Sequence, residues 1–283
     1  MWRGLFIFLV CQFTIEAGII LHYDFEKLGG NVIYTSNNEY KGQIHGAISQ
    51  VEGISGKAMI LDGEKNYIEI PSPPDLSAGY TISMWIYLET ESEEQNRWPT
   101  IISSGNTERK EGLSMYFYPG NHNVDSLRGA FAVCHGTGEE LSYAIFTSIP
   151  QAVTKGWHHY CVVYDGIITR LYFDGILMEA ISQKKPFFEK NTSLIIGGRK
   201  NLSGDTFFKG IIDELVIIDR ALNLDDVLLL KKGEISRIKS KVTLTEKEIP
   251  SDVLNLPPPN SATEKYKKLC WYIADGNITL AVS

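Results

Sequence analysis

The sequence lacks an excess of basic residues. Its 283 residues include 27 lysines and arginines against 34 aspartates and glutamates, which gives a net charge of −7. A surface that binds nucleic acid needs clustered lysine and arginine to contact the phosphates, so this balance disfavours nucleic acid as a partner. Apolar residues make up 43 % of the chain and charged residues 22 %. These values are ordinary for a globular protein and argue against general disorder.

Long apolar runs are missing after the first seventeen residues. A membrane-spanning helix needs about 20 consecutive apolar residues, and no later stretch approaches this length, so we predict no transmembrane segment. The N-terminus has a basic residue, Arg3, then an apolar run over residues 5–13, and then a small residue, Ala17. This order is typical of a secretory signal peptide. We therefore expect residues 1–17 to be a signal peptide and the mature chain to be secreted into the extracellular space.

Cysteine is scarce, with four residues in the whole chain, one of which, Cys11, lies in the expected signal peptide. An oxidising compartment favours one disulfide among the remaining cysteines and leaves one thiol over. Cys134 and Cys161 both lie in strand-like runs of the main domain, so we predict a disulfide between them. Cys270 stands alone near the C-terminus. The sequence leaves open whether it is a buried thiol or pairs with another chain.

Asparagine-linked glycosylation would fit the same secretory route. The acceptor motif, Asn followed at the second position by Ser or Thr, occurs at Asn191, Asn201 and Asn277. A signal peptide exposes such motifs to the glycosylation machinery. Asn201 lies in a stretch with glycine and aspartate that is typical of a loop, so it is the strongest candidate of the three.

Helical periodicity is rare in residues 18–232. Short alternating or apolar runs recur there between turn signals such as Asp165-Gly166 and Asp174-Gly175. This pattern predicts an all-β protein, an antiparallel sandwich or barrel. The exception is residues 223–231, where aspartates at the start and lysines at the end favour a short helix.

The run over residues 81–88 shows the alternation of a half-buried strand. Successive side chains of a strand point to opposite faces, so the apolar set is expected in the core: Ile82, Met84, Ile86 and Leu88. Ser83, Trp85 and Tyr87 then lie on the other face, which is either solvated or part of a groove.

The composition changes after residue 232. Residues 233–264 are rich in lysine, glutamate and proline, including the run Leu256-Pro-Pro-Pro259, and we expect an extended linker there. Residues 265–283 form a short apolar segment that can supply a strand or two but is too short to bury a core alone. We therefore expect one main domain, residues 18–232, with a short C-terminal extension.

Several segments of the main domain together resemble the laminin-G-like domains of the concanavalin A-like lectin/glucanase superfamily. They are residues 21–26 (LHYDFE), 56–63 (GKAMILDG), 66–71 (NYIEIP), 80–85 (YTISMW), 157–160 (WHHY), 164–166 (YDG), 171–175 (LYFDG), 194–198 (LIIGG), 208–214 (FKGIIDE) and 220–222 (RAL). Their order covers nearly all of residues 18–232. The resemblance implies a jelly roll, in which two curved antiparallel sheets pack face to face as a sandwich.

The resemblance also implies a structural calcium site. In this superfamily such a site often joins the N-terminal strand to the late strand that carries Ile-Asp-Glu. The matching carboxylates in this chain are Asp24 and Asp213. Calcium takes about 6–8 oxygen ligands, so backbone carbonyls and waters would have to complete the set. The alternative is that both carboxylates cap turns or pair with lysine.

Catalytic constellations are missing from the sequence. A glycoside hydrolase needs two carboxyl groups about 5–10 Å apart, and the nearest match to the glucanase pattern, residues 89–94, lacks the central aspartate and is expected to be a loop. The neighbouring His158 and His159 should point to opposite faces of a strand, which disfavours a shared zinc ion. No Gly-x-Ser-x-Gly motif or phosphate-loop lysine occurs.

Recognition of a ligand is therefore the favoured function. Aromatic rings stack on sugars and anchor protein interfaces, and the candidates on a sheet surface are Trp85, Tyr87, Tyr116, Tyr118 and Tyr172. Most such rings could instead fill the core. We expect a secreted, non-catalytic recognition or adhesion module, stabilised by calcium, that binds a glycan or an extracellular protein. The alternatives are a glycoside hydrolase with an unfamiliar site and a purely structural extracellular domain.

Overall fold

The computed structural model describes residues 19–35, 40–71, 73, 75–88, 98–106, 109–119, 122–148, 156–190, 192–199, 206–238, 269–274 and 277–282. The expected signal peptide, most of the expected linker, the acidic run 89–94 and the acceptors Asn191 and Asn201 lie outside these residues. Asn277 begins the last strand, but its side chain lies outside the description.

Two antiparallel sheets of eight strands each make up the main domain. Sheet A has the order β14-β13-β12-β7-β16-β5-β4, with β1 paired to β16. Its strands are β1 (Ile19–Tyr23), β4 (Ser49–Glu52), β5 (Lys57–Asp62), β7 (Tyr80–Leu88), β12 (Gly156–Tyr164), β13 (Ile168–Phe173), β14 (Ile176–Ser182) and β16 (Lys209–Ile218).

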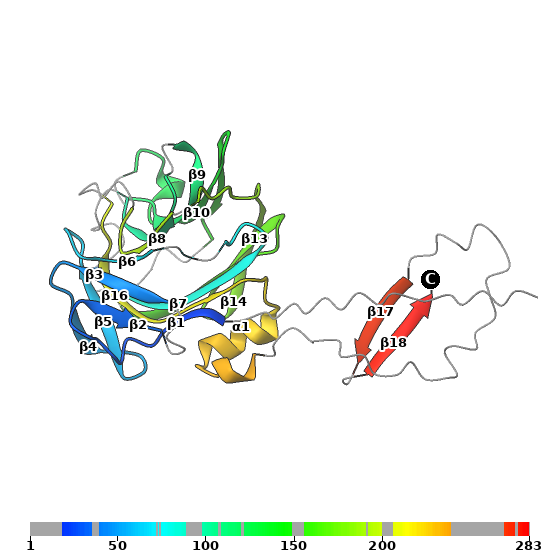
Figure 1. The fold of residues 1–283 in the computed structure, drawn as a ribbon. Helices are drawn as coiled ribbons and strands as arrows, with labels where there is room; N and C mark the ends of the chain where they lie inside the picture. Colours follow the sequence, from blue (N-terminus) through cyan, green and yellow to red (C-terminus); the bar gives the residue numbers. More distant parts are fainter. Residues whose placement is uncertain are drawn as a thin grey trace, which may run out of the picture. The chain divides into compact units, whose positions relative to one another are not determined.

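Sheet B has the order β11-β10-β9-β8-β15-β6-β3-β2. Its strands are β2 (Val32–Tyr34), β3 (Lys41–His45), β6 (Tyr67–Ile70), β8 (Thr100–Ser104), β9 (Glu111–Phe117), β10 (Phe131–Thr137), β11 (Leu141–Phe146) and β15 (Leu194–Ile196). The two sheets form the layers of a sandwich (Figure 1), which confirms the expected all-β, concanavalin A-like architecture.

The core lies between the two sheets. On β7 the alternate residues Ile82, Met84, Ile86 and Leu88 are all at most 1 % exposed and belong to the main hydrophobic cluster, as the sequence predicts. Sheet B contributes the alternate residues of β9 and β10, among them Phe117, Phe131 and Val133. Each strand therefore gives one face to the core and leaves the other on an outer surface of the sandwich.

Tight turns fix the register of the sheet A hairpins. The β13–β14 hairpin turns at Asp174 and Gly175, whose φ angles are 51° and 81°. Two positive φ angles match the right-handed twist of the flanking strands, and Asp-Gly tolerates them well. At the β12–β13 turn, the Oδ1 atom of Asp165 accepts hydrogen bonds from the amides of Ile167 and Ile168. Both predicted turns are confirmed.

One helix, α1 (Leu224–Lys231), lies against the outer face of sheet A (Figure 1). Asn223 caps its start by accepting a hydrogen bond from the amide of Asp226 at 2.9 Å. Val227 and Leu230 pack into a second hydrophobic cluster with Cys161 and other outward-facing residues of sheet A. No helix in the described part of the chain is long and apolar enough to cross a membrane.

The predicted disulfide between Cys134 and Cys161 is wrong. Both cysteines are free and buried, and they lie on different sheets. Cys134 follows the core residue Val133 and therefore faces outward from sheet B, while Cys161 lies between two core residues of β12 and faces outward from sheet A. Packed sheets are about 10 Å apart, whereas a disulfide needs Cα atoms within about 7 Å.

The C-terminal segment forms a separate unit of the chain. Strands β17 (Leu269–Ala274) and β18 (Asn277–Val282) pair antiparallel, with Leu269 opposite Val282 and Ala274 opposite Asn277. The apolar segment does supply two strands, as its composition predicts. Cys270 lies in β17, and nothing further about its side chain is described.

Candidate functional site

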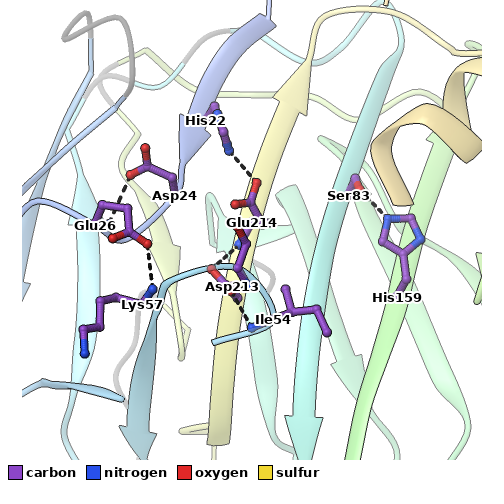
Figure 2. A network of polar contacts seen from close by, with 10 residues as sticks. His22, Asp24, Glu26, Ile54, Lys57, Ser83, His159, Asp213 and Glu214 are labelled. Atoms are coloured by element: carbon purple, nitrogen blue, oxygen red, sulfur yellow. Dashed lines mark hydrogen bonds and ion pairs between the residues drawn. The ribbon is translucent and has the colours of Figure 1, made fainter. Parts of the chain in front are cut away.

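Asp213 lies at the centre of a polar network on β16, an interior strand of sheet A that pairs with β7, β5 and β1 (Figure 2). It is fully buried on β16, and its Oδ2 atom accepts hydrogen bonds from the amides of Ile54 at 2.9 Å and Ser55 at 3.1 Å. Its Oδ1 atom accepts from the amide of Glu214 at 2.8 Å. Burial raises the pKa of the Asp213 carboxyl to about 6, although these three amides act in the opposite direction.

Two other acidic residues hold the same region together. Glu26 accepts a hydrogen bond from the amide of Lys57 at 2.6 Å, and Asp24 accepts one from the amide of Glu26 at 3.2 Å. The turn between β4 and β5 is thus held by Asp213 at its beginning and by Glu26 at its end (Figure 2). The main contacts of these carboxylates are to backbone amides, which is the turn-capping role that the sequence allowed.

The expected calcium ligands therefore lie in the same part of the fold, but they do not form a ready set. Both oxygens of Asp213 already accept hydrogen bonds, and the described residues contain no group of three or more acidic, histidine or cysteine side chains arranged to hold a metal. A hard cation would depend on backbone carbonyls to complete its shell. Calcium binding by Asp24 and Asp213 stays a prediction.

A serine–histidine pair, which the sequence did not reveal, lies on the outer face of sheet A. The Nε2 atom of His159 is 2.8 Å from the hydroxyl of Ser83. Both residues are buried, and burial lowers the pKa of His159 to about 4. Within the described structure, the Nδ1 atom of His159 has no hydrogen-bond partner. Among the described residues no carboxylate accepts a hydrogen bond from this Nδ1 atom, and both side chains are buried, so the pair lacks the oriented imidazole and the accessible hydroxyl of a catalytic dyad.

The predicted aromatic candidates divide between the two outer faces. Trp85 and Tyr87 of β7 lie on sheet A, where the Tyr87 and Trp157 rings pack edge to face at 5.5 Å. Tyr172 is also on this face but is only 6 % exposed, inside the cluster beneath α1. The neighbouring polar groups, Asp213 and His159, already bind partners within the protein. This face therefore offers rings but few free hydrogen-bonding groups.

The outer face of sheet B carries a different group, which we call the β9 aromatic cluster: Trp98, Tyr116, Tyr118 and His122. The ring of Trp98 lies 5.8 Å from Tyr116 and 5.2 Å from Tyr118, both edge to face, and Tyr118 lies 5.1 Å from His122. Tyr116 and Tyr118 are mostly buried, while Trp98 and His122 are half-buried. Trp98 and His122 therefore expose part of their rings, and Tyr116 and Tyr118 support them from below.

Arg199 lies over this cluster. Its guanidinium carbon is 4.8 Å from the centre of the Tyr116 ring, within the range of a cation–π contact. Its Nε atom donates to the hydroxyl of Thr100 at 3.0 Å, and that hydroxyl donates to the carbonyl of Trp98 at 2.9 Å. None of the described carboxylates forms an ion pair with Arg199. Its end-on nitrogens, Nη1 and Nη2, are therefore held in place without an acidic partner.

Polar side chains continue across the same face. Glu69 of β6 accepts a hydrogen bond from Ser193 at 2.7 Å and lies 3.2 Å from the Nε2 atom of His45, whose ring stacks on Tyr67 at 4.3 Å. The side chains of His45 and Glu69 are each 35 % exposed. Strands are about 4.8 Å apart, so β9 and β6, three places apart in the sheet, are separated by about 14 Å. An oligosaccharide could extend across this width.

Sequence reasoning identified Tyr116 and Tyr118 but missed Trp98, His122 and Arg199. Trp98 and His122 lie outside the strands, next to polar segments of the sequence. Hydrophobic periodicity predicts the faces of strands and helices, but it does not predict where a residue outside them packs. Arg199 directly follows the Gly197-Gly198 pair that closes β15. A glycine pair that ends an apolar strand can mark a close backbone approach, and the hydrogen bond from Ser103 to the Gly198 carbonyl at 2.8 Å shows this approach.

Comparisons with known proteins agree with this architecture. A solved structure of domain 4 of an extracellular arabinanase from Geobacillus stearothermophilus, in complex with arabinotriose, matches with a TM-score of 0.59 and 24 % identity, over 76 % of this chain and 99 % of that domain. The receptor-binding domain of the botulinum neurotoxin C/D mosaic serotype matches with a TM-score of 0.58 and 15 % identity. A botulinum neurotoxin DC binding domain in complex with rat synaptotagmin II matches with a TM-score of 0.57 and 12 % identity.

These structures share the fold; the two toxin structures are described as binding domains, and the arabinanase domain holds arabinotriose. The match covers 77 % of this chain and 52 % of the C/D toxin domain, and 76 % of this chain and 51 % of the DC domain, so this chain corresponds to about half of each. No curated protein matches the sequence. A family model described as the concanavalin A-like lectin/glucanases superfamily, Laminin_G_3, matches residues 62–228, from the end of β5 into α1. The chain therefore belongs to the concanavalin A-like lectin/glucanases superfamily.

Proposed function

We propose that this chain is a secreted, non-catalytic module that binds a glycan on the outer face of sheet B. The observation that carries the proposal is the β9 aromatic cluster, with Arg199 and the polar group around Glu69 on the same face. Sugar sites combine ring surface for stacking with a few well-placed hydrogen-bonding groups. On sheet A the Asp213 carboxylate and the Nε2 atom of His159 already bind partners within the protein, and helix α1 covers part of the face.

The arabinanase domain supports the proposal, since that domain, which has the same fold, was solved with a bound trisaccharide. An extracellular protein is the competing ligand, as in the toxin domain bound to synaptotagmin. Secretion rests on the N-terminal sequence alone. The buried serine–histidine pair gives no support to hydrolysis, so binding without catalysis is the function that the described site favours.

A glycan array tests the proposal. The purified chain should bind a defined subset of saccharides, and Trp98→Ala should weaken that binding about five- to hundredfold, because a stacking ring at the centre of a site contributes about 1–3 kcal/mol. Trp85→Ala is the matched control, since it removes the same ring from the outer face of sheet A. Its binding should equal that of the unmodified chain. Absence of binding to any saccharide, or equal losses in the two variants, would contradict the proposal.

A further inference from the structure

We propose that the glycan recognised by this face carries a carboxylate, as a uronic or sialic acid does, and that Arg199 binds it. This inference rests on the proposed function and narrows it to a ligand class. Arg199 is fixed from two sides, by the ring of Tyr116 and by the hydroxyl of Thr100. Its outer nitrogens remain for a ligand, and a planar guanidinium matches a carboxylate through two parallel hydrogen bonds.

The surroundings of Arg199 explain why it is available. The acidic residue described on this face, Glu69, is already engaged by Ser193 and His45. The tyrosines and the cysteine near Arg199 are neutral at physiological pH, because burial raises the pKa of Tyr143 to about 12 and that of Cys134 to about 11. The positive charge of Arg199 is therefore not cancelled by the described side chains around it.

Charge also favours selectivity at this position. The chain as a whole has a net charge of −7, so an acidic ligand is repelled by most of the surface. At Arg199, which forms no ion pair with a described carboxylate, the attraction between the guanidinium and an acidic glycan would exceed this repulsion. A neutral sugar would leave the guanidinium without a charged partner and would use only the rings.

The test compares a charged saccharide with its neutral form. The purified full chain is titrated with an oligogalacturonate and with the methyl ester of the same oligomer, which keeps the rings and hydroxyls but removes the charge. The charged form should bind at least tenfold more tightly, and its affinity should fall as the salt concentration rises. A sialylated oligosaccharide and a sulfated one are measured alongside.

Variants at position 199 assign the effect to one side chain. Arg199→Gln should lose about ten- to hundredfold in affinity for the charged saccharide and little for a neutral one, because a charged hydrogen bond contributes about 1.5–3 kcal/mol. Arg170→Gln is the matched control: it is a half-buried arginine on the outer face of sheet A, and its loss should leave binding unchanged. If Arg199→Gln fails to fold, Arg199→Lys is used instead. Lysine keeps the positive charge but cannot donate two parallel hydrogen bonds, so this variant should retain part of the preference for the charged saccharide.

The outcomes separate the inference from the proposed function. Equal affinity for the oligogalacturonate and its ester would overturn the inference and leave glycan binding intact. Binding of the sulfated saccharide without either carboxylated one, or equal binding of polyglutamate, would also overturn it. Absence of binding to every saccharide would overturn the proposed function itself. Preference for the carboxylated sugars that Arg199→Gln abolishes and Arg170→Gln preserves would establish the assignment.

Discussion

The two outer faces of the sandwich carry different kinds of side chain and are covered to different extents. On the outer face of sheet A, helix α1 covers an apolar cluster that includes Cys161, Val163 and Tyr172. Ser83 and His159 are buried on the same face and bind each other. On sheet B, rings, hydroxyls and one arginine lie on a face against which, among the described helices, only the short 3-10 helix η3 (Asp125–Leu127) packs, through Leu127, and no α-helix. The strands of both sheets alternate in the same way, so the difference comes from which side chains occupy the outward positions.

The contrast lies in how the outward positions of each sheet are covered. Apolar outward positions on sheet A need a cover, and α1 supplies it with Val227 and Leu230. On sheet B the outward positions include the partly exposed side chains of Trp98, His45 and Glu69, which tolerate water without a covering helix of that kind. A scaffold can bind reliably at one face when the other is held rigid.

The largest effect should come from breaking the cover of sheet A. Val227 is fully buried between α1 and the sheet, so Val227→Asp places an unpaired charge there and should lower the free energy of unfolding by about 3–5 kcal/mol. Urea denaturation followed by tryptophan fluorescence measures the loss.

Leu224→Asp is the matched control for that variant. Leu224 is 47 % exposed at the first turn of the same helix, where a negative charge is favourable, so its unfolding free energy should change by less than about 0.5 kcal/mol. Similar losses in the two variants would show that α1 does not cover the sheet in the way described. Below its melting temperature, Val227→Asp should still bind saccharide, since the binding face lies on the other sheet.

Acid should destabilise the protein by an intermediate amount through two buried histidines. His159 lies on the outer face of sheet A, and His135 lies at the end of the core, where its Nε2 atom accepts from the hydroxyl of Tyr80 at 2.8 Å. Burial lowers the pKa of each from 6.5 to about 4. Between these values the unfolded chain binds a proton that the folded chain does not, so stability falls as the pH falls from 6.5 to 4. Each histidine should contribute up to about 3 kcal/mol of this loss.

Unfolding free energies measured from pH 7.5 to pH 4 check the sign and the assignment. Asp213 acts in the opposite direction below about pH 6, because its raised pKa lets the folded state bind the extra proton, so it offsets part of the loss. His159→Gln should make the pH dependence shallower, because it removes a group whose pKa burial lowers to about 4. A slope that His159→Gln does not alter would refute the assignment for sheet A.

Much of the fold follows from short-range patterns. Three local patterns predicted their own secondary structure, and the structure confirms all three. They are the alternation in β7, the Asp-Gly turns, and the order of aspartates before lysine in α1. Strands β2, β3 and β4 escaped prediction because they are short and contain polar residues such as Lys41, Gln43 and Gln50. β2 pairs with β3 and β4 pairs with β5, each the next strand along the chain, and β3 also pairs with β6. These strands depend on that pairing and not on the β propensity of their own residues.

The candidate site was harder to predict because it depends on which strands become neighbours. Tyr116 and Arg199 are far apart in sequence, and only the sheet order β9-β8-β15 brings them together. The same limit explains the error over Cys134 and Cys161. Both lie in apolar strands, but the outward direction of each depends on the sheet to which its strand belongs. Composition could not distinguish two faces that point away from each other.

The smallest change in the free energy of unfolding should come from replacing the two cysteines, one of which lies on each outer face. Cys134→Ala should lower the unfolding free energy by about 1 kcal/mol, the usual cost of a small change in a packed cluster, whereas loss of a disulfide costs about 2–5 kcal/mol. Cys161→Ala is measured with it, and so is the double variant. Because the two thiols lie on opposite faces with no shared partner, the two losses should add within about 0.5 kcal/mol. A bond between them would make either single variant as costly as the double one, so a non-additive cycle would place the two cysteines in contact and contradict the separation of the two faces.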